Sequence, residues 1–298
     1  MCTSRMTRSH TGSFAKPPCA WRASLLAGSL ALALNLVPAR VWAVPGGQID
    51  VENRFPNVCM FYARNAEGRI GSCSGTLIHP RVVLTAGHCT EGLLAFAGSL
   101  DQLFVSFDPD NAFLNEPRAV AAVLTIPEFN ANSLANDIGL VILAEPVLDI
   151  EPARLPPRDL PEPYLDMQLE QGNLRWRDER ADMWIAGYGT TVELAPFEIV
   201  PPDGARRFGL TKFKALLPPH WLLITQHEAQ GIDLPGSCFG DSGGPTFFED
   251  PDTGELVLIT VTSFTGQCMG FGGLQRVDNF NVLDFIHSVL DAVENGMF

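Results

Sequence analysis

GDSGGP, residues Gly240 to Pro245, sets a serine among three glycines, and two other short motifs stand upstream of it. LTAGHC contains His88, and NDIGLV contains Asp137. A serine hydroxyl is a weak nucleophile at neutral pH, so it needs an adjacent base and a third group that orients the base. His88, Asp137 and Ser242 can supply these groups, which predicts a site built on a nucleophilic serine.

In their local sequences and in the order His, Asp, Ser, these motifs resemble those of the chymotrypsin/trypsin-like serine proteases, from Val44 to the C-terminal helix. The resemblance implies an all-β fold of two six-stranded antiparallel β-barrels with the active site between them, followed by a C-terminal α-helix. It implies that Ser242 attacks a peptide carbonyl, His88 moves the proton and Asp137 orients the imidazole. The backbone N–H groups of Gly240 and Ser242 are implied to bind the oxyanion.

The residue pattern also predicts an all-β chain, because short β-branched and aromatic runs alternate with Gly, Pro, Asn and Asp, and helical periodicity is almost absent before the C-terminal region. With the two-barrel fold in view, twelve runs are interpreted as strands, six on each side of a proline-rich stretch. They are Val58–Ala63, Ser74–Ile78, Val82–Thr85, Leu103–Phe107, Val120–Ile126, Ile138–Leu143, Met183–Ala186, Phe208–Leu216, Trp221–Thr225, Thr246–Phe248, Leu256–Phe264 and Leu274–Val277.

The chain is expected to divide into five segments. Residues 44–145 form the N-terminal barrel with His88 and Asp137, and residues 181–277 form the C-terminal barrel with Ser242. Residues 146–180 connect them, because six prolines between Ala144 and Pro163 favour an extended crossing. Residues 278–298 form a terminal amphipathic helix, since apolar residues recur there at helical spacing.

The first segment, residues 1–43, is interpreted as a secretory signal peptide. It lacks Asp and Glu, carries basic residues, runs apolar from Ala23 to Val37 and ends in the small residue Ala43. An uncleaved membrane anchor is the alternative, but the apolar run is shorter than the roughly 20 residues that span a bilayer. The protein is therefore expected to be secreted, to the extracellular space or the periplasm.

Removal of residues 1–43 would leave 15 basic and 34 acidic residues, a net charge of −19. Such a charge disfavours nucleic acid and anionic lipid as partners, and it is expected to serve solubility. A monomer that acts on a protein or peptide substrate is expected. No cofactor or metal is predicted, because H-E-x-x-H is absent and the acidic stretch Asp108 to Asn111 has the character of a turn.

Five cysteines follow the expected signal peptide, and an exported protein favours disulfides. Spacing alone leaves their connectivity open. The resemblance implies a Cys73–Cys89 pair, which would pin the short turn expected to carry His88, and a Cys238–Cys268 pair across the substrate pocket. Cys59 is left over and is expected to be a buried, inert thiol; a reactive or intermolecular thiol is the alternative.

The resemblance also implies an activation step, in which a freed amino terminus pairs with the aspartate before the nucleophile, Asp241. Counting back from Phe55-Pro56 makes Val44 the new terminus. Because Ala43 precedes it, signal peptidase itself can generate the amine, and export is expected to yield active enzyme with no zymogen stage. In the alternative, the terminus stays in solvent and Asp241 is ordered in another way.

Substrate preference in such proteases depends on the residue six before the nucleophile, here Gly236. Without an aspartate there, burial of an Arg or Lys side chain is uncompensated, which disfavours trypsin-like cleavage. Thr265 is expected to narrow the pocket, while Gly272 or Gly273 leaves the other wall open; an outward-facing Thr265 is the alternative. An uncharged, small or medium apolar residue before the cut is therefore predicted.

The same pocket is expected to include Ser237. The backbone of Ser263, Phe264 and Thr265 is expected to bind an extended peptide as an added antiparallel strand. By resemblance, the Ser263 side chain also hydrogen-bonds Asp137.

Two other functions are compatible with these motifs. A protease-like chain can be catalytically silent and serve as a binding module, although this chain keeps all three residues of the triad. Because GDSGG also satisfies G-x-S-x-G, an esterase is the other candidate. An α/β-hydrolase is disfavoured, since its acid and histidine follow the serine and its strands alternate with helices.

Overall fold

The computed structural model describes residues 44, 46–113, 117–158, 182–194, 197–200, 202–217, 221–225, 234–250, 253–266, 268 and 270–298. All of them belong to one compact unit, residues 38–298. The expected signal peptide lies outside the described residues, as do residues 159–180 of the expected connector.

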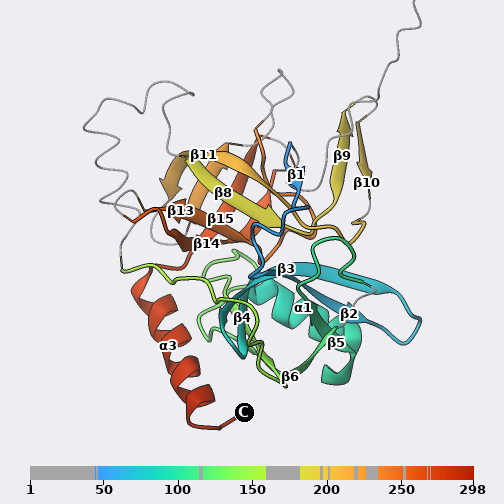
Figure 1. Ribbon diagram of the computed structural model, residues 1–298, viewed down its shortest axis with the longest axis vertical. Helices are drawn as coiled ribbons and strands as arrows, with labels where there is room; N and C mark the ends of the chain where they lie inside the picture. Colours follow the sequence, from blue (N-terminus) through green and yellow to red (C-terminus); the bar gives the residue numbers. More distant parts are fainter. Residues whose placement is uncertain are drawn as a thin grey trace, which may run out of the picture. The chain divides into compact units, whose positions relative to one another are not determined.

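Six strands of the N-terminal half form a closed antiparallel barrel in the order β2-β3-β4-β7-β6-β5 (Figure 1). Its interior is apolar because β4 and β7 are buried along their whole length and β2 along nearly all of its length. The strands are β2 Val58–Arg64, β3 Ile70–His79, β4 Val82–Thr85, β5 Leu103–Ser106, β6 Arg118–Thr125 and β7 Gly139–Leu143.

The C-terminal half forms a second antiparallel sheet that also closes, because β8 pairs with both β11 and β13. The short strand β1 (Gln48–Ile49) adds to the edge of β11, and a hairpin of β9 and β10 projects beside this sheet (Figure 1). The strands are β8 Asp182–Gly187, β9 Thr191–Leu194, β10 Phe197–Val200, β11 Arg207–Leu217, β12 Trp221–Thr225, β13 Pro245–Glu249, β14 Leu256–Thr265 and β15 Phe271–Arg276.

The predicted all-β fold is confirmed, and each of the twelve predicted strands is present with ends shifted by a few residues. The expectation of a short turn around His88 is wrong. An α-helix, α1 (Gly87–Ala97), carries this residue and is followed by the 3-10 turn η1 (Leu100–Gln102). Glycines at 87 and 92 interrupt the apolar pattern, so the sequence gives little helical signal there.

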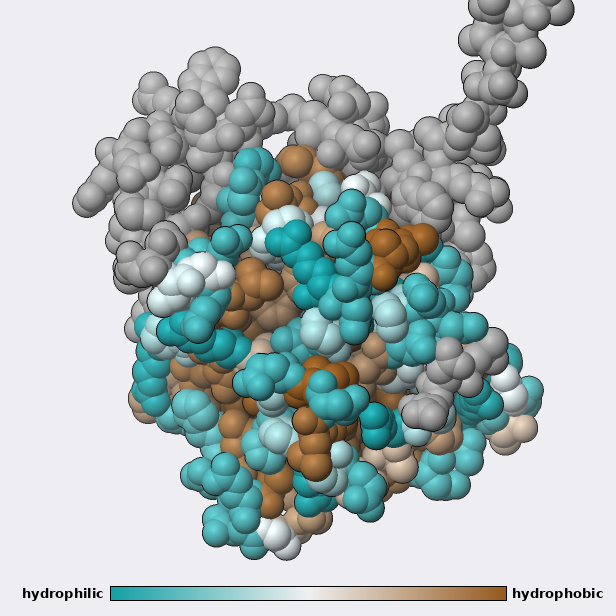
Figure 2. All heavy atoms as spheres, in the orientation of Figure 1, coloured by the Kyte–Doolittle hydropathy of each residue, from teal (hydrophilic) through white to brown (hydrophobic). Residues whose placement is uncertain are grey.

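The predicted terminal helix is present as α3 (Phe280–Glu294), which lies within the predicted residues 278–298 and is shorter at both ends. Its buried residues recur at helical spacing and join the largest apolar cluster, which also contains the interior of the first barrel. These residues are Val282, Leu283, Ile286, Val289 and Val293. Polar residues cover much of the coloured part of the face shown in Figure 2, with apolar residues between them.

The contacts that join the barrels include two groups outside the region of His88 and Ser242. The segment after β7 hydrogen-bonds both: Ala153 N donates to Leu77 O at 2.8 Å, and Leu258 N donates to Arg154 O at 2.9 Å. The second group surrounds Arg206, whose fully buried guanidinium lies 2.8 Å from the equally buried carboxylate of Asp50. None of the helices within the described ranges combines the length and apolar character needed to cross a bilayer.

Candidate active site

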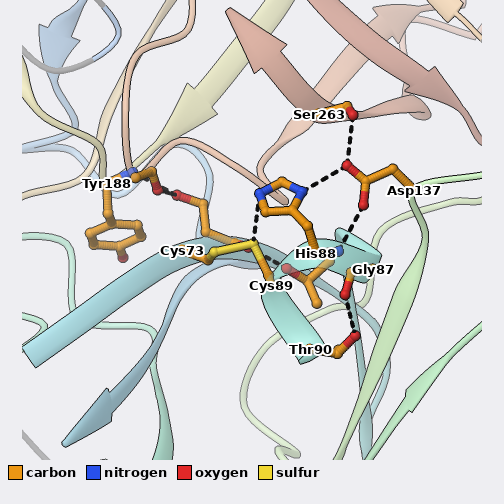
Figure 3. The surroundings of a disulfide bond; sticks show 11 residues. Cys73, Gly87, His88, Cys89, Thr90, Asp137, Tyr188 and Ser263 are labelled. Carbon is orange, nitrogen blue, oxygen red and sulfur yellow. Dashed lines mark hydrogen bonds and ion pairs between the residues drawn. A yellow bond between two sulfur atoms is a disulfide. The ribbon is translucent and has the colours of Figure 1, made fainter. Parts of the chain in front are cut away.

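His88 and Asp137 are in direct contact between the start of α1 and the start of β7 (Figure 3). His88 Nδ1 lies 2.7 Å from Asp137 Oδ2, and the backbone N–H of His88 donates to Oδ1 at 2.8 Å. The carboxylate is fully buried, whereas the imidazole is partly exposed. A proton on Nδ1 satisfies the carboxylate and leaves Nε2 free to accept another proton.

The second barrel also holds Asp137. Ser263 on β14 donates its hydroxyl to Oδ2 at 2.6 Å (Figure 3), as the resemblance implied. Gln275 on β15, which the sequence analysis did not single out, accepts the Asp137 N–H through Oε1 at 3.2 Å. Gln275 is fully buried, and a buried amide N–H without such an acceptor would destabilise the turn.

Ser242 lies in a tight turn before β13, where Gly240 and Gly243 adopt φ angles of 93° and 82°. A Cβ on Gly243 would lie 2.0 Å from Thr85 Oγ1, so this position requires glycine. Three amides of the turn have backbone acceptors: Asp241 N donates to Cys238 O, Gly243 N to Thr262 O and Gly244 N to Asp241 O.

The two remaining amides of this turn, Gly240 N and Ser242 N, have no acceptor among the described residues. Both residues are only partly buried. Unpaired donors in a concave turn can bind an oxyanion, which is the role that the resemblance implied for these two groups.

The turn is attached to the strand beside His88. Ser74 N donates to Ser242 O at 2.7 Å, and its neighbour Cys73 forms a disulfide with Cys89, which follows His88 (Figure 3). Among the described residues no hydrogen bond joins Ser242 Oγ to His88, whose Nε2 lies 3.6 Å from Cys89 Sγ. Catalytic hydrogen bonds of this kind commonly tighten only when substrate binds.

Both disulfides implied by the resemblance are formed, with Cα atoms 6.2 Å apart for Cys73–Cys89 and 4.5 Å apart for Cys238–Cys268. Cys73, His88 and Cys89 cluster closely, but the two sulfurs are bonded to each other and therefore do not form a metal-ligand set. Cys59 is free and buried, and burial raises the pKa of its thiol, which keeps it unreactive.

Asp241 is fully buried behind the Ser242 turn. Burial raises the pKa of Asp241 to about 6, although its carboxylate accepts the N–H groups of Cys238 at 2.9 Å and of Gly189 at 2.8 Å. The backbone N–H of Val44 is a third donor. The structure thus brings together the two residues expected to form the activation pair.

Val44 itself is fully buried and packs in the apolar cluster of the second barrel. Its φ of 47° is strained for a β-branched residue in a continuous chain. A chain that began at Val44 would lack this constraint, because φ would no longer be defined by a preceding carbonyl carbon.

A cavity of about 220 Å³ lies beside Ser242. The Thr265 hydroxyl donates to Ser237 O at 3.0 Å and accepts Cys268 N–H at 3.1 Å, so two hydrogen bonds hold its side chain in place. The described residues that line this cavity are Cys238, Phe239, Ser242, Thr262, Ser263, Phe264 and Thr265.

The two candidate wall glycines differ in their surroundings. A Cβ on Gly273 would lie 2.1 Å from the Phe264 ring, so Gly273 supports that ring. Gly272 pairs with Thr265 across the β14–β15 ladder, and neither glycine is among the described residues that line the cavity. Gly236 and Ser237 are buried and do not appear in the cavity lining.

The trypsin family model matches residues 44–201, which is more than half of the chain. This chain belongs to the chymotrypsin/trypsin-like family of serine proteases. Among curated members of the family, "Trypsin, alkaline C" of Manduca sexta is 25% identical over 256 residues, covering 79% of this chain and 86% of the moth protein.

Two other relatives in the trypsin family are longer. "Inactive CLIP domain-containing serine protease A28" of Anopheles gambiae is 27% identical over 202 residues, covering 67% of this chain and 50% of that protein. "Serine protease 56" of Mus musculus is 32% identical over 216 residues, covering 67% of this chain and 31% of that protein. This chain thus spans half or less of the length of these two relatives.

Proposed function

We propose that this protein is a secreted serine endopeptidase that cleaves peptide bonds through an acyl-enzyme. Ser242 Oγ attacks the carbonyl carbon while His88 Nε2 takes the hydroxyl proton and then delivers it to the leaving amine. Water releases the acyl group by the same path in reverse. Asp137 keeps the imidazole oriented, and the amides of Gly240 and Ser242 stabilise the tetrahedral oxyanion.

The observation that supports this proposal is the pair of amides at Gly240 and Ser242, which have no acceptor among the described residues, in a turn whose other amides are paired. A binding module has no need for two such donors beside a serine. Loss of one oxyanion donor typically costs about 3 kcal/mol of transition-state stabilisation, which gives selection a reason to keep them.

Covalent labelling tests the proposal. A fluorophosphonate should label the wild type and leave Ser242→Ala unlabelled, and the wild type should cleave peptides in a mixed library. A folded wild type that is neither labelled nor active would support the catalytically silent binding module, consistent with a relative named as inactive. Turnover of small esters without any peptide cleavage would support the esterase.

For the bond that is cut, we infer a preference for an uncharged, small or medium apolar residue. The supporting observation is that Thr265 lines the cavity beside Ser242 and is held by hydrogen bonds to Ser237 O and from Cys268 N. The absence of an acid at Gly236 leaves a basic side chain uncompensated. Profiling with a peptide library that varies this position is the test.

We also infer secretion and activation by signal cleavage, with Val44 as the mature terminus. The buried Val44, its strained φ and its contact with Asp241 support this step. Amino-terminal sequencing of the secreted form should begin at Val44. Without residues 1–43 the chain has 15 basic and 34 acidic residues, a net charge of −19. We infer that the protein is a monomer without a nucleic-acid partner, because such a charge repels both nucleic acid and other copies of the chain.

A further inference from the structure

Ser74, on β3 of the first barrel, is fully buried against the Ser242 turn of the second. Its hydroxyl donates to Gly240 O at 2.9 Å and accepts the Tyr188 N–H at 2.9 Å. Its own backbone N–H donates to Ser242 O at 2.7 Å. One residue of the first barrel therefore holds two carbonyls of the turn that carries the nucleophile.

The Ser74 hydroxyl also contacts the segment that binds the Asp241 carboxylate. Tyr188 lies between Gly187 and Gly189, and Gly189 N–H donates to the Asp241 carboxylate at 2.8 Å. A Cβ on Gly187 would lie 2.3 Å from Asp241 Oδ1 and 3.2 Å from Ser74 Oγ, so the three residues are packed without spare space. Movement of the Ser74 hydroxyl would be transmitted to both sides of the turn.

Orientation of the Gly240 peptide needs such a contact. Gly240 has a φ of 93°, a region open to glycine, and glycine imposes little restriction on rotation. A hydrogen bond to its carbonyl limits rotation about the Gly240–Asp241 peptide and so limits where the amides of Gly240 and Ser242 lie. A displacement of about 1 Å in a catalytic group can cost around a hundredfold in rate.

We propose that Ser74 is a positioning residue that holds the oxyanion-binding turn in place from the first barrel. The inference rests on the proposed peptidase function for its effect on rate, but the positioning itself is a property of the turn. Ser74 touches neither the reacting atoms nor the substrate; it acts through Gly240 and Ser242.

Ser74→Ala removes the hydroxyl and keeps the backbone bond to Ser242. We expect kcat to fall about tenfold with KM changed less than twofold, because transition-state stabilisation is lost and ground-state binding is kept. Affinity for a peptide boronic acid, whose tetrahedral adduct occupies the oxyanion site, should fall by a similar factor. Affinity for the corresponding product peptide should stay the same.

Ser72→Ala is the matched control, since Ser72 lies two residues earlier on the same face of β3 and its hydroxyl makes no hydrogen bond within the described residues. It should behave as wild type. Wild-type kcat and boronate affinity in Ser74→Ala would overturn the proposal. Equal losses for boronate and product peptide would also overturn it, because they would indicate a general structural effect.

Amide NMR separates this inference from the proposed function. Ser74→Ala should shift the Gly240 and Ser242 amide resonances and leave those of His88 unchanged, whether or not the wild type cleaves peptides. Shifted resonances in a protein without peptidase activity would refute the proposed function and retain the positioning role; unchanged resonances would refute the positioning role. If the alanine variant does not fold, Ser74→Gly, which also lacks the hydroxyl, takes its place.

Discussion

Asp137 is held by groups from both barrels. His88 binds both of its carboxylate oxygens from α1, while Ser263 binds one of them from β14. Gln275 accepts its N–H from β15. The orientation of the imidazole therefore depends on residues that come from three separate elements.

Replacement of Gln275 by methionine keeps the side-chain length and removes the acceptor for Asp137 N–H. We expect kcat to fall about tenfold with little change in KM, because the acid is displaced from His88. In an Asp137→Asn background the same substitution should add no further loss, since coupled residues are not additive. Steady-state and burst kinetics on the four variants measure this.

Thr260→Val is the control for Gln275→Met. Thr260 is buried on the neighbouring strand β14, and its hydroxyl has no partner among the described residues. Its replacement should leave kcat unchanged. The assignment would be contradicted if Gln275→Met lowered kcat in the Asp137→Asn background by the same factor as it does in the wild type.

Thr265→Gly should enlarge the cavity beside Ser242. Thr265 lines this cavity, so removing its side chain adds to the space beside Ser242. We expect kcat/KM for phenylalanine before the cut to rise at least about tenfold relative to alanine, since each methylene accommodated contributes about 1–3 kcal/mol. A peptide pair that differs only at this residue gives the ratio, and an unchanged ratio would show that Thr265 does not set the pocket depth.

At the scale of elements, the segment from Val44 to β1 lies along the edge of the second barrel. Gln48 pairs with Phe208 and Ile49 with Arg207, while Gly47 N donates to Val44 O at 2.6 Å. This pairing places Val44 beside Asp241 while the chain is still continuous. The proposed cleavage before Val44 would therefore change the charge at this position without requiring a new path for the segment.

The raised pKa of Asp241, about 6 against an ordinary value of 3.8, predicts a pH-dependent stability in the chain that retains residue 43. The carboxyl binds its proton more tightly in the folded state, so its contribution is present below about pH 4 and is lost as pH rises through about 6. A shift of about two units corresponds to about 3 kcal/mol in the free energy of unfolding.

Denaturant unfolding from pH 4 to 7 measures this contribution. The stability advantage of the wild type over Asp241→Asn should decrease across that range in the uncleaved chain. In the form that begins at Val44 the freed ammonium faces the carboxylate, and the decrease should be smaller. Identical pH profiles for the two forms would contradict the Val44–Asp241 pair.

Twelve of the strands could be predicted because their apolar and β-branched residues fall in short runs between turn residues, as in β7 and β14; β1, β9 and β10 were not predicted. α1 could not, because Gly87 and Gly92 interrupt its pattern. The local settings of His88, Asp137 and Ser242 identify them from sequence. Ser74 and Gln275 are buried polar residues inside strands, and their partners lie on the other barrel, so no local signal distinguishes them from ordinary strand residues.

At the scale of the whole molecule, Arg206 joins both barrels to the N-terminal segment. Its guanidinium binds Asp50 and Asn53 and donates to Val58 O and Phe107 O of the first barrel. A buried ion pair of this kind adds little to the free energy of unfolding relative to apolar packing. Loss of one partner, however, leaves an uncompensated buried charge.

Arg206→Met should therefore lower the free energy of unfolding by about 3–5 kcal/mol, because Asp50 stays buried without its partner. Arg69→Met, which breaks the exposed pair with Glu67, is the control and should change stability by less than about 1 kcal/mol. Denaturant unfolding of both variants checks the difference. Similar losses for the two would show that Asp50 is neutralised in some other way.

The backbone bonds of Ala153 and Arg154 connect one extended segment to both barrels. A segment bonded on both sides limits rotation of one barrel against the other. Under the proposed peptidase function, the polypeptide substrate must then supply the conformational change that brings its peptide bond to Ser242. Flexible loops and tails extend at low cost, whereas helices and sheets must first unfold locally. Compact proteins should therefore be cut first at their least protected segments, and cleavage rates should follow local unfolding of the target.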